Sequence, residues 1–291
     1  MRNMIPVLRR RIAIVPLLML LSVCLLFGAG VHAGERPVRV GLTPVILEDQ
    51  VRFLEQWRRY LEQELGREVQ FLRRNSYGEI IELALRGQVD FAWVCGFPYV
   101  RHQDTLDLLA APVFNGAPRY QSYLIVPATD EDTRGLMDLE GGIFAFSDPN
   151  SNSGWLYPEA LLRRNGTRSD QHFDRTFYTW GHRRVIEAVA HGLAEGGAVD
   201  GYVWETLARV EPELTDRTRI VNRSDAFGFP PVVATPAADA EMRRAVLEVL
   251  LTMQHSERGR ELLGTLNLDG FSEVAPDLYE SIRQLSREVV Q

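Results

Sequence analysis

The sequence predicts an α/β fold of two lobes joined by two crossing strands. Short apolar runs alternate with amphipathic segments in the first third of the chain, which is the order of a parallel sheet with crossover helices. A second alternation covers residues 136–203. A long strand at 120–126 and a return strand at 227–234 flank it, and no low-complexity linker separates them. The expected lobes are interleaved, with residues 34–122 and 231–291 in the first and residues 123–230 in the second.

The elements of the first lobe follow from apolar runs that end at turn residues. Strands are expected at residues 38–42, 69–72 and 89–94, and helices at about 49–65 and 77–86. Pro44 stops the first strand, while Gly66 and Gly87 follow the two helices, as glycine commonly does. Ser76 stands where it can cap the second helix. The strand–helix order predicts that these three strands run parallel.

The second lobe repeats the pattern around a polar turn at residues 147–154. Its strands are expected at 120–126, 143–146, 173–178 and 199–203, and its helices at 155–164 and 182–193. The return strand at 227–234 then leads back to the first lobe. Three helices complete the chain, at about 238–255, 257–263 and 276–289.

Residues 1–33 have the pattern of a secretory signal peptide. Arginines gather near the start, an apolar stretch spans residues 12–27, and small residues lead to a Val-x-Ala site that ends at Ala33. A membrane anchor is the alternative, but this stretch is short for a span of about 20 residues. We therefore expect a periplasmic protein with a cleaved leader.

The charge balance disfavours two classes of partner. The chain holds 32 basic residues, every one an arginine, and 39 acidic residues, which gives a formal net charge of −7. Cleavage after Ala33 would remove four arginines and no acid, and the net charge would become −11. This excess of acid argues against nucleic acid and anionic membranes. A small anion remains a candidate, because a local group of donors matters more than net charge.

Cys95 is the one cysteine beyond the predicted leader, which contains Cys24. It follows the apolar strand at residues 89–94, and Gly96 and Pro98 come directly after it. In open α/β sheets, ligands bind at the carboxyl ends of strands. An unpaired thiol in an exported protein points to a reactive or metal-binding group. The alternative is a small buried side chain that only fills space.

Three segments resemble the signature of phosphonate/phosphite-type periplasmic solute-binding proteins. They are residues 87–93 (GQVDFAW) with the preceding helix, residues 146–154 (FSDPNSNSG), and residues 181–182 with 188–192 and 199–200 (GH, AVAHG and VD). The resemblance covers nearly the whole chain after the leader. It implies a type II two-lobed binding protein that serves an ABC importer or a sensor, without a cofactor.

Two departures from the family pattern fall in the expected cleft. The family usually has Ser-Thr-Ser where this chain has Ser151, Asn152 and Ser153, and Gly-Pro where it has Cys95 and Gly96. These changes resemble the arsenite-sensing branch of the family. That resemblance implies Cys95 as a ligand of trivalent arsenic and a membrane sensor kinase as partner. The alternative is a phosphonate, phosphite or phosphate ligand delivered to an ABC permease.

Chemistry distinguishes the two ligand classes. A soft thiolate suits trivalent arsenic better than it suits phosphate. Uncharged arsenous acid needs one sulfur and polar partners for its hydroxyls. Pentavalent oxyanions need N–H and arginine donors instead.

Each of the other candidate binding residues also has an alternative interpretation as a purely structural residue. Ser151, Asn152 and Ser153 precede a helix, where free N–H groups favour an oxyanion, but Ser and Asn also cap ordinary helices. His182 begins a helix and is a ligand donor or a capping residue. Tyr77 and Tyr99 offer hydroxyls or pack in the core. Glu205 matches the family's acidic position at the cleft edge, and its alternative is a surface carboxylate.

An enzyme is the least favoured class. Cys95, His182 and Glu205 are in an order that does not forbid a triad. No catalytic signature surrounds Cys95, however. The three residues would also come from two lobes that move relative to one another. We therefore expect a binding protein and no catalysis.

Overall fold

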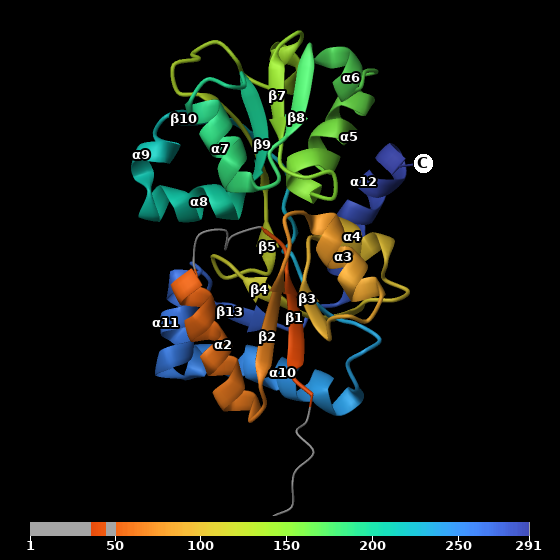
Figure 1. Cartoon of the computed structure of the whole chain (residues 1–291). Coiled ribbons are helices and arrows are strands. Elements are labelled where there is room, and N and C mark those ends of the chain that lie inside the picture. Colours follow the sequence, from red (N-terminus) through yellow and green to blue (C-terminus); the bar gives the residue numbers. More distant parts are fainter. Residues whose placement is uncertain (1–35, 45–50, 291) are drawn as a thin grey trace, which may run out of the picture. The chain divides into compact units, whose positions relative to one another are not determined.

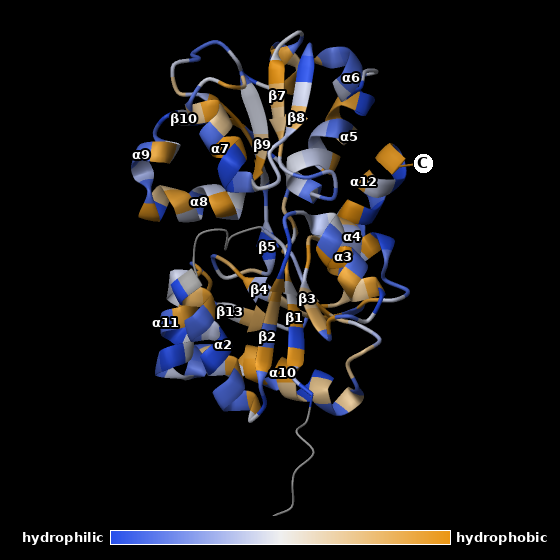
Figure 2. Cartoon of the chain, in the orientation of Figure 1, coloured by the Kyte–Doolittle hydropathy of each residue, from blue (hydrophilic) through white to orange (hydrophobic). Residues whose placement is uncertain are grey.

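The computed structural model describes residues 36–44 and 51–290. The predicted leader at residues 1–33 lies outside them. From Pro37 onward the chain forms one compact unit, built on two separate mixed sheets (Figure 1). Apolar residues are concentrated in the strands and on the helix faces that cover them (Figure 2). The prediction of a two-lobed α/β fold is confirmed.

The first lobe has a six-stranded sheet in the order β13-β4-β12-β3-β1-β2. Its strands are β1 (Val38–Leu42), β2 (Val69–Arg73), β3 (Phe91–Trp93), β4 (Asp107–Val113), β12 (Val232–Ala234) and β13 (Gly270–Ser272). The predicted parallel pairing is present, since β1 lies between β2 and β3 and runs parallel to both. The sheet is mixed because β12 runs antiparallel to β3 and β4.

The second lobe has a five-stranded sheet in the order β10-β6-β9-β7-β8. Its strands are β6 (Ser122–Pro127), β7 (Ile143–Phe146), β8 (Arg175–Tyr178), β9 (Gly196–Asp200) and β10 (Thr218–Arg223). The strands β7, β8 and β9 are parallel, and β6 runs antiparallel to β9 and β10. A two-stranded ribbon of β5 (Arg119–Tyr120) and β11 (Phe227–Gly228) lies where the chain passes between the sheets.

Helices cover both sheets. The first lobe contains α2 (Val51–Leu65), α3 (Tyr77–Leu85), α4 (Gly96–Arg101), α10 (Ala240–Thr252) and α11 (Glu257–Thr265). The second lobe contains α5 (Tyr157–Arg164), α6 (Ser169–His172), α7 (His182–Ala190), α8 (Gly201–Val210) and α9 (Pro212–Thr215). The last helix, α12 (Glu280–Val290), packs against α4 of one lobe and α5 of the other. It therefore bridges the lobes.

Two predicted long strands are broken in the structure. The expected strand 120–126 is divided between β5 and β6 at Gln121. The expected return strand 227–234 is divided between β11 and β12, and Pro230 and Pro231 lie in the break. A proline has no N–H to give to a sheet ladder. The pairing of each connection is therefore interrupted between a short ribbon strand and the sheet of a lobe.

The predicted strand at residues 199–203 is also wrong. The strand β9 ends at Asp200, whose carboxylate accepts a hydrogen bond from the Tyr202 N–H at 2.9 Å. This N-cap starts α8 at Gly201. Val203 and Glu205 consequently lie in a helix. Gly197 is required inside β9, because a Cβ atom there would lie 2.5 Å from Val185 of α7.

Three strands and three short helices were not predicted. The strands β4, β10 and β13 and the helices α4, α6 and α9 lie in segments without a clear period of two or 3.6 residues. The predicted helix at residues 155–164 begins earlier, with a π-helical turn at Asn152–Leu156 before α5. π turns of this kind are frequent at functional sites.

Candidate functional site

Cys95 lies at the carboxyl end of β3 and precedes α4, as the sequence predicts. Its side chain is buried, and its Sγ accepts a hydrogen bond from the backbone N–H of Asn152 at 3.3 Å. Asn152 belongs to the second lobe. Burial raises the pKa of the Cys95 thiol to about 11, and hydrogen bonds from backbone N–H groups, which lower the pKa, offset only part of this effect. The group is therefore an uncharged thiol at neutral pH.

The turn at Ser151, Asn152 and Ser153 is fully buried. The Oγ of Ser151 accepts a hydrogen bond from the N–H of Gly154 at 3.0 Å, which closes the start of the π-helical turn. Glycine is needed here, because a Cβ atom at residue 154 would lie 1.9 Å from Ser147 Oγ. The Asn152 amide donates to the hydroxyl of Tyr120 at 2.9 Å.

Four buried polar groups around this turn have no hydrogen-bond partner among the described residues. They are the hydroxyls of Tyr77, Ser147 and Ser153 and the amide oxygen of Asn152. Such groups are uncommon, because each one costs about 1–3 kcal/mol when it is left unpaired. A concentration of them beside one thiol marks a place built for a polar ligand. Tyr77 packs directly with Cys95.

His182 begins α7 and is buried, with its Nδ1 accepting a hydrogen bond from the N–H of Asp200 at 3.1 Å. A backbone N–H can only donate, so Nδ1 is unprotonated and Nε2 carries the proton. Burial lowers the pKa of His182 to about 3. The imidazole is therefore neutral and retains one N–H donor. Its Cε1 atom lies beside Gly154.

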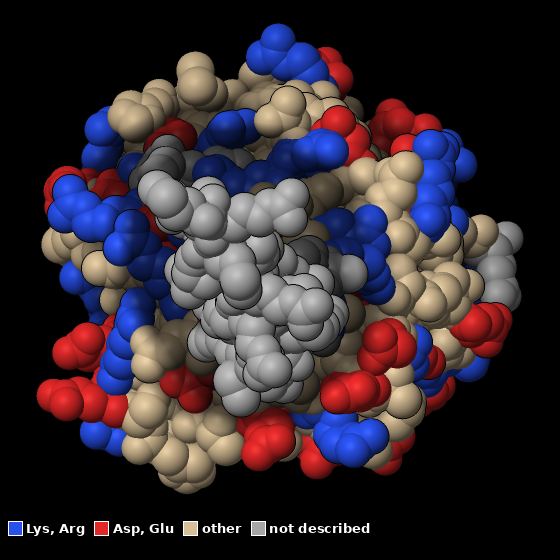
Figure 3. All heavy atoms as spheres, turned by 60° about the horizontal axis from the view of Figure 1, so that its bottom comes forward, with Lys and Arg blue, Asp and Glu red and all other residues tan. Residues whose placement is uncertain are grey.

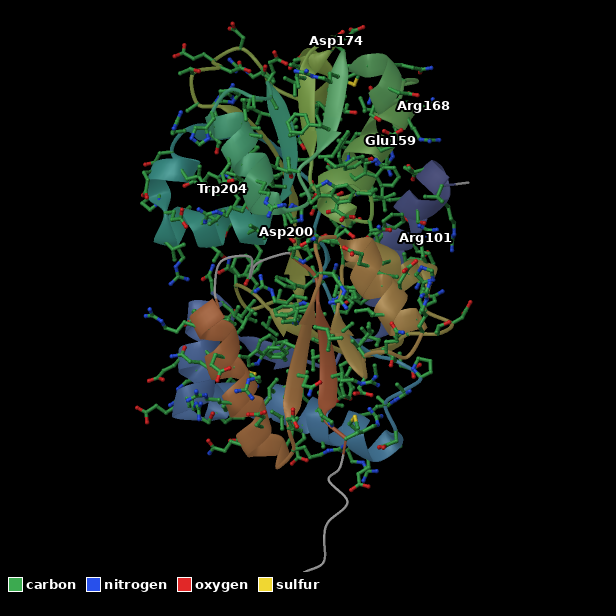
Figure 4. The ribbon with its side chains drawn as sticks, viewed as in Figure 1. Arg101, Glu159, Arg168, Asp174, Asp200 and Trp204 are labelled. Atoms are coloured by element: carbon green, nitrogen blue, oxygen red, sulfur yellow. The ribbon has the colours of Figure 1, made fainter. Side chains whose placement is uncertain are left out.

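Asp200 belongs to the same group of residues, although the sequence analysis did not name it as a site residue. It lies at the end of the second-lobe sheet that faces the first lobe (Figure 4). Its N–H donates to His182 Nδ1, and its carboxylate, when it is charged, raises the pKa values of Tyr77, Cys95 and Tyr120. Burial raises the pKa of Asp200 to about 8. At neutral pH most of this carboxyl is protonated and can donate a hydrogen bond.

Six predicted residues thus converge, and with Asp200 and Tyr120 they form the buried cluster. Its members are Tyr77, Cys95, Tyr120, Ser151, Asn152, Ser153, His182 and Asp200. Asp200 could have been predicted as a site residue, because it belongs to the VD pair at residues 199–200 in the third family-like segment. Nothing in the sequence distinguishes Tyr120 from its neighbours in the predicted strand. Arginine is absent from this cluster, which relies on neutral donors and one thiol.

The structure places two predicted site residues elsewhere. The ring of Tyr99 packs edge-on against Tyr279, with centroids 4.9 Å apart, and its electrostatic neighbours are Arg283 and Asp107. Tyr99 is thus a packing residue of α4. Glu205 accepts a hydrogen bond from the hydroxyl of Tyr123. It lines a hollow of about 180 Å³ beside the β5–β11 ribbon, and Tyr120 of the buried cluster also lines this hollow.

No cluster of three or more His, Cys, Asp or Glu side chains suited to a metal ion occurs among the described residues. No helix in the described ranges is long and apolar enough to cross a membrane.

The fold and the buried cluster between two lobes define a solute-binding protein. Residues 40–279 match the family model described as "ABC transporter, phosphonate, periplasmic substrate-binding protein". The chain belongs to this family. The resemblance inferred from the motifs is therefore confirmed at the level of the family, and the arsenite-sensing branch remains a prediction.

Similar proteins include the "Phosphate-import protein PhnD" of Mycolicibacterium smegmatis. It is 30% identical over 205 residues, which are 66% of this chain and 63% of the relative. The "Phosphonates-binding periplasmic protein" of Escherichia coli is 26% identical over 215 residues, which are 69% and 62% of the two chains. This chain therefore spans slightly less than two thirds of either relative's length.

Solved structures agree in fold. A binding protein component of an ABC phosphonate transporter from Pseudomonas aeruginosa has a TM-score of 0.79 at 23% identity, over 87% of this chain and 86% of that one. PhnD1 from Prochlorococcus marinus, in complex with methylphosphonate, has a TM-score of 0.76 at 20% identity, over 88% and 99% of the two chains.

Proposed function

We propose that this protein captures a small oxyacid in the periplasm, at the buried cluster, and delivers it to an ABC permease. The observation that carries the proposal is the set of four unpaired polar groups around Cys95. They come from both lobes, so an oxyacid bonded to all of them stabilises the closed arrangement. The predicted leader at residues 1–33 accounts for export.

A phosphorus oxyanion is the first ligand candidate, and the names of the relatives support it. The cluster offers the donors that such an anion needs. Hydroxyl groups come from Tyr77 and Ser153, and an N–H comes from His182 Nε2. The proton on Asp200 adds a fourth donor. Neutral donors of this kind bind an oxyanion without the cost of burying a cation.

Arsenite is the second candidate, and Cys95 is the specific observation that favours it. Arsenous acid condenses with a thiol: an As–OH bond and the S–H bond break, an As–S bond forms, and one water leaves. The condensation needs no oxidant. The thiolate is the more reactive form of the sulfur, and burial, which raises the pKa of Cys95, works against it. The remaining arsenic hydroxyls would bond to Tyr77 and Ser153. A membrane sensor kinase is the partner in this case.

Catalysis has less support than binding. The sequence left a Cys95, His182 and Glu205 triad open. Glu205 instead accepts a hydrogen bond from the Tyr123 hydroxyl and lines the hollow beside the β5–β11 ribbon. His182 uses Nδ1 for a backbone N–H, and so does not face a carboxylate there.

Tryptophan fluorescence of the mature protein tests the proposal. Phosphite, methylphosphonate, phosphate and arsenite are titrated into the wild type and into Cys95→Ser. A saturable response to a phosphorus oxyanion that survives in Cys95→Ser supports the importer. A saturable response to arsenite that disappears in Cys95→Ser supports arsenic capture. Absence of any saturable response in the folded wild type would refute oxyacid capture.

A further inference from the structure

Asn152 holds an unpaired group of the buried cluster whose hydrogen-bonding role is fixed. The other three unpaired groups are the hydroxyls of Tyr77, Ser147 and Ser153. A hydroxyl can rotate, so each of them can donate or accept as a ligand requires. The amide oxygen of Asn152 has no hydrogen and can only accept. Whatever pairs with it must therefore be a donor.

The other polar atoms of Asn152 already have partners. Its backbone N–H donates to Cys95 Sγ at 3.3 Å, and its carbonyl accepts from the N–H of Tyr157 at the end of the π-helical turn. Its amide nitrogen donates to the Tyr120 hydroxyl at 2.9 Å. The residue is fully buried, and its Oδ1 has no partner in the part of the chain that the structure describes. A buried acceptor of this kind is costly until a donor reaches it.

The charges of the cluster also favour a ligand that has kept a proton. Basic and acidic side chains are intermixed on the face of the molecule shown in Figure 3, but no arginine belongs to the cluster. His182 is neutral, because burial lowers its pKa to about 3. A buried anion without a cation beside it is costly, and each proton on the ligand lowers its negative charge by one. Asp200 adds a further negative charge when it ionises.

We propose that the buried cluster selects an oxyacid that still carries a proton on oxygen, and that Asn152 Oδ1 accepts the hydrogen bond from this O–H group. The inference rests on the proposed function and narrows its ligand class. Phosphite, phosphonates and phosphate in their protonated anions belong to this class, and so does arsenous acid. Sulfate has no proton at neutral pH and is excluded. A ligand without the O–H group leaves Oδ1 unpaired in the complex, which is a strong basis for discrimination.

Methylphosphonate and dimethylphosphinate test the proposal as a matched pair. At about pH 5.5, below the second ionisation of a phosphoryl group, both are monoanions, and a methyl group of the phosphinate replaces the O–H group of the phosphonate. In calorimetric titrations of the full mature chain, methylphosphonate should bind at least about tenfold more tightly. Sulfate should show no saturable binding. Equal affinities for the two monoanions, or tight binding of sulfate, would overturn the proposal.

Asn152→Leu tests whether Asn152 is the residue that recognises the O–H group. Leucine has a similar size and cannot accept a hydrogen bond. The ratio of the two affinities should fall to about threefold or less, because methylphosphonate loses a bond that dimethylphosphinate never makes. Asn165→Leu is the control: it makes the same substitution at an exposed amide, which donates to Leu161 at 2.8 Å, and should keep the wild-type ratio. A wild-type ratio in folded Asn152→Leu would overturn the role of Asn152.

Nuclear magnetic resonance of the ligand-free wild type tests the orientation of the amide without any ligand. The side-chain amide protons of Asn152 should show nuclear Overhauser contacts to the ring protons of Tyr120, because Nδ2 faces that hydroxyl. Amide protons that lack these contacts would mean that Nδ2 takes the place of Oδ1, and the proposal would be wrong. If neither phosphorus monoanion binds, the proposed phosphorus ligand fails, while the amide orientation still decides whether the cluster presents an acceptor.

Discussion

Tyr77 and Tyr99 show how little a residue type says about its role. Both are buried tyrosines in the same lobe, and the sequence predicted a ligand contact for each. Tyr77 starts α3 and holds an unpaired hydroxyl beside Cys95. Tyr99 lies one turn along α4, against Tyr279. The difference is set by the direction of each helix in the lobe, which single-sequence patterns do not contain.

Tyr77→Phe should affect stability and affinity in opposite directions. The unpaired hydroxyl costs about 1–3 kcal/mol in the ligand-free protein, so its removal should leave the free energy of unfolding unchanged or raise it. Affinity for the bound oxyacid should fall about tenfold or more, since one hydrogen bond is lost. Urea unfolding and fluorescence titration measure the two effects. Tyr99→Phe is the control and should bind with wild-type affinity; equal losses in both variants would remove Tyr77 from the site.

Asp200 and His182 should shape the pH dependence of stability. The pKa of Asp200 is raised to about 8, so this group destabilises the fold progressively as pH rises from about 4 to 8. The pKa of His182 is lowered to about 3, so this group stabilises the fold progressively between about 3 and 6.5. The two slopes, each about 1.4 kcal/mol per pH unit, oppose one another up to pH 6.5. Their joint effect is a loss of stability between pH 6.5 and 8.

Asp200→Asn isolates the contribution of His182 to the pH dependence of stability. The Asn side chain can still accept the Tyr202 N–H that caps α8. The free energy of unfolding of this variant should rise from pH 4 to 6.5 and then level off. Urea unfolding of the ligand-free protein at several pH values gives the comparison. A variant whose profile parallels the wild type would show that Asp200 does not carry a raised pKa.

The elements of the fold were predictable where the apolar pattern was strong. The strands β1, β2 and β7 and the helices α2, α3 and α7 lie close to their expected positions. The errors fall at residues 199–203 and 227–234, where side-chain capping and prolines override an apolar run. Small sheet-edge strands such as β13 depend on partners far away in the sequence. The turn at residues 151–153 was expected to cap a helix, and the structure has a π-helical turn there, in which Gly154 lies close to Ser147.

Gly154→Ala should damage this turn. The added methyl would lie 1.9 Å from Ser147 Oγ, so backbone or side chain must shift. We expect a loss of about 1–3 kcal/mol in unfolding free energy, together with weaker oxyacid binding. Gly264→Ala in α11 meets nothing within 4 Å and should stabilise by about 0.5–1 kcal/mol. Thermal unfolding of both variants checks the contrast. Equal changes in stability in the two variants would mean that the turn is not tightly packed.

The whole molecule is held together across the cleft by a few specific contacts. Asn152 donates to Cys95, and Tyr77 donates to Asp148. On the far side, Arg164 of α5 forms a two-point ion pair with Glu288 of α12 at 2.8 and 2.9 Å. That pair is half-exposed and should contribute less than about 1 kcal/mol. Further contacts join the lobes through the Tyr202 hydroxyl, which donates to the carbonyl of Leu266, and through the Asn267 amide, which donates to Thr206 Oγ1 at 3.1 Å.

The ligand-free protein should exchange between open and closed arrangements of the two lobes. Oxyacid binding should shift this equilibrium toward the closed arrangement. A bound oxyacid adds contacts from both lobes to those already present, which favours the closed state. The radius of gyration from X-ray scattering should fall when the mature protein is saturated with the oxyacid it binds. Asp148→Ala, which removes one contact across the cleft, should increase the radius without ligand. Identical scattering with and without a saturating ligand would rule out closure as the response.

The burial of Cys95 between the lobes makes the protein its own reporter of opening. Cys24 lies in the predicted leader, so a chain cleaved at the predicted site would carry Cys95 as its single thiol. A bulky maleimide can reach that sulfur only when the lobes part. Suppose that the lobes close again faster than the reagent reacts. The alkylation rate of Cys95 is then the product of two quantities: the rate for an exposed thiol of the same pKa, and the fraction of molecules whose lobes are open. Mass spectrometry of one alkylation time course would then give the free energy of opening without an introduced label.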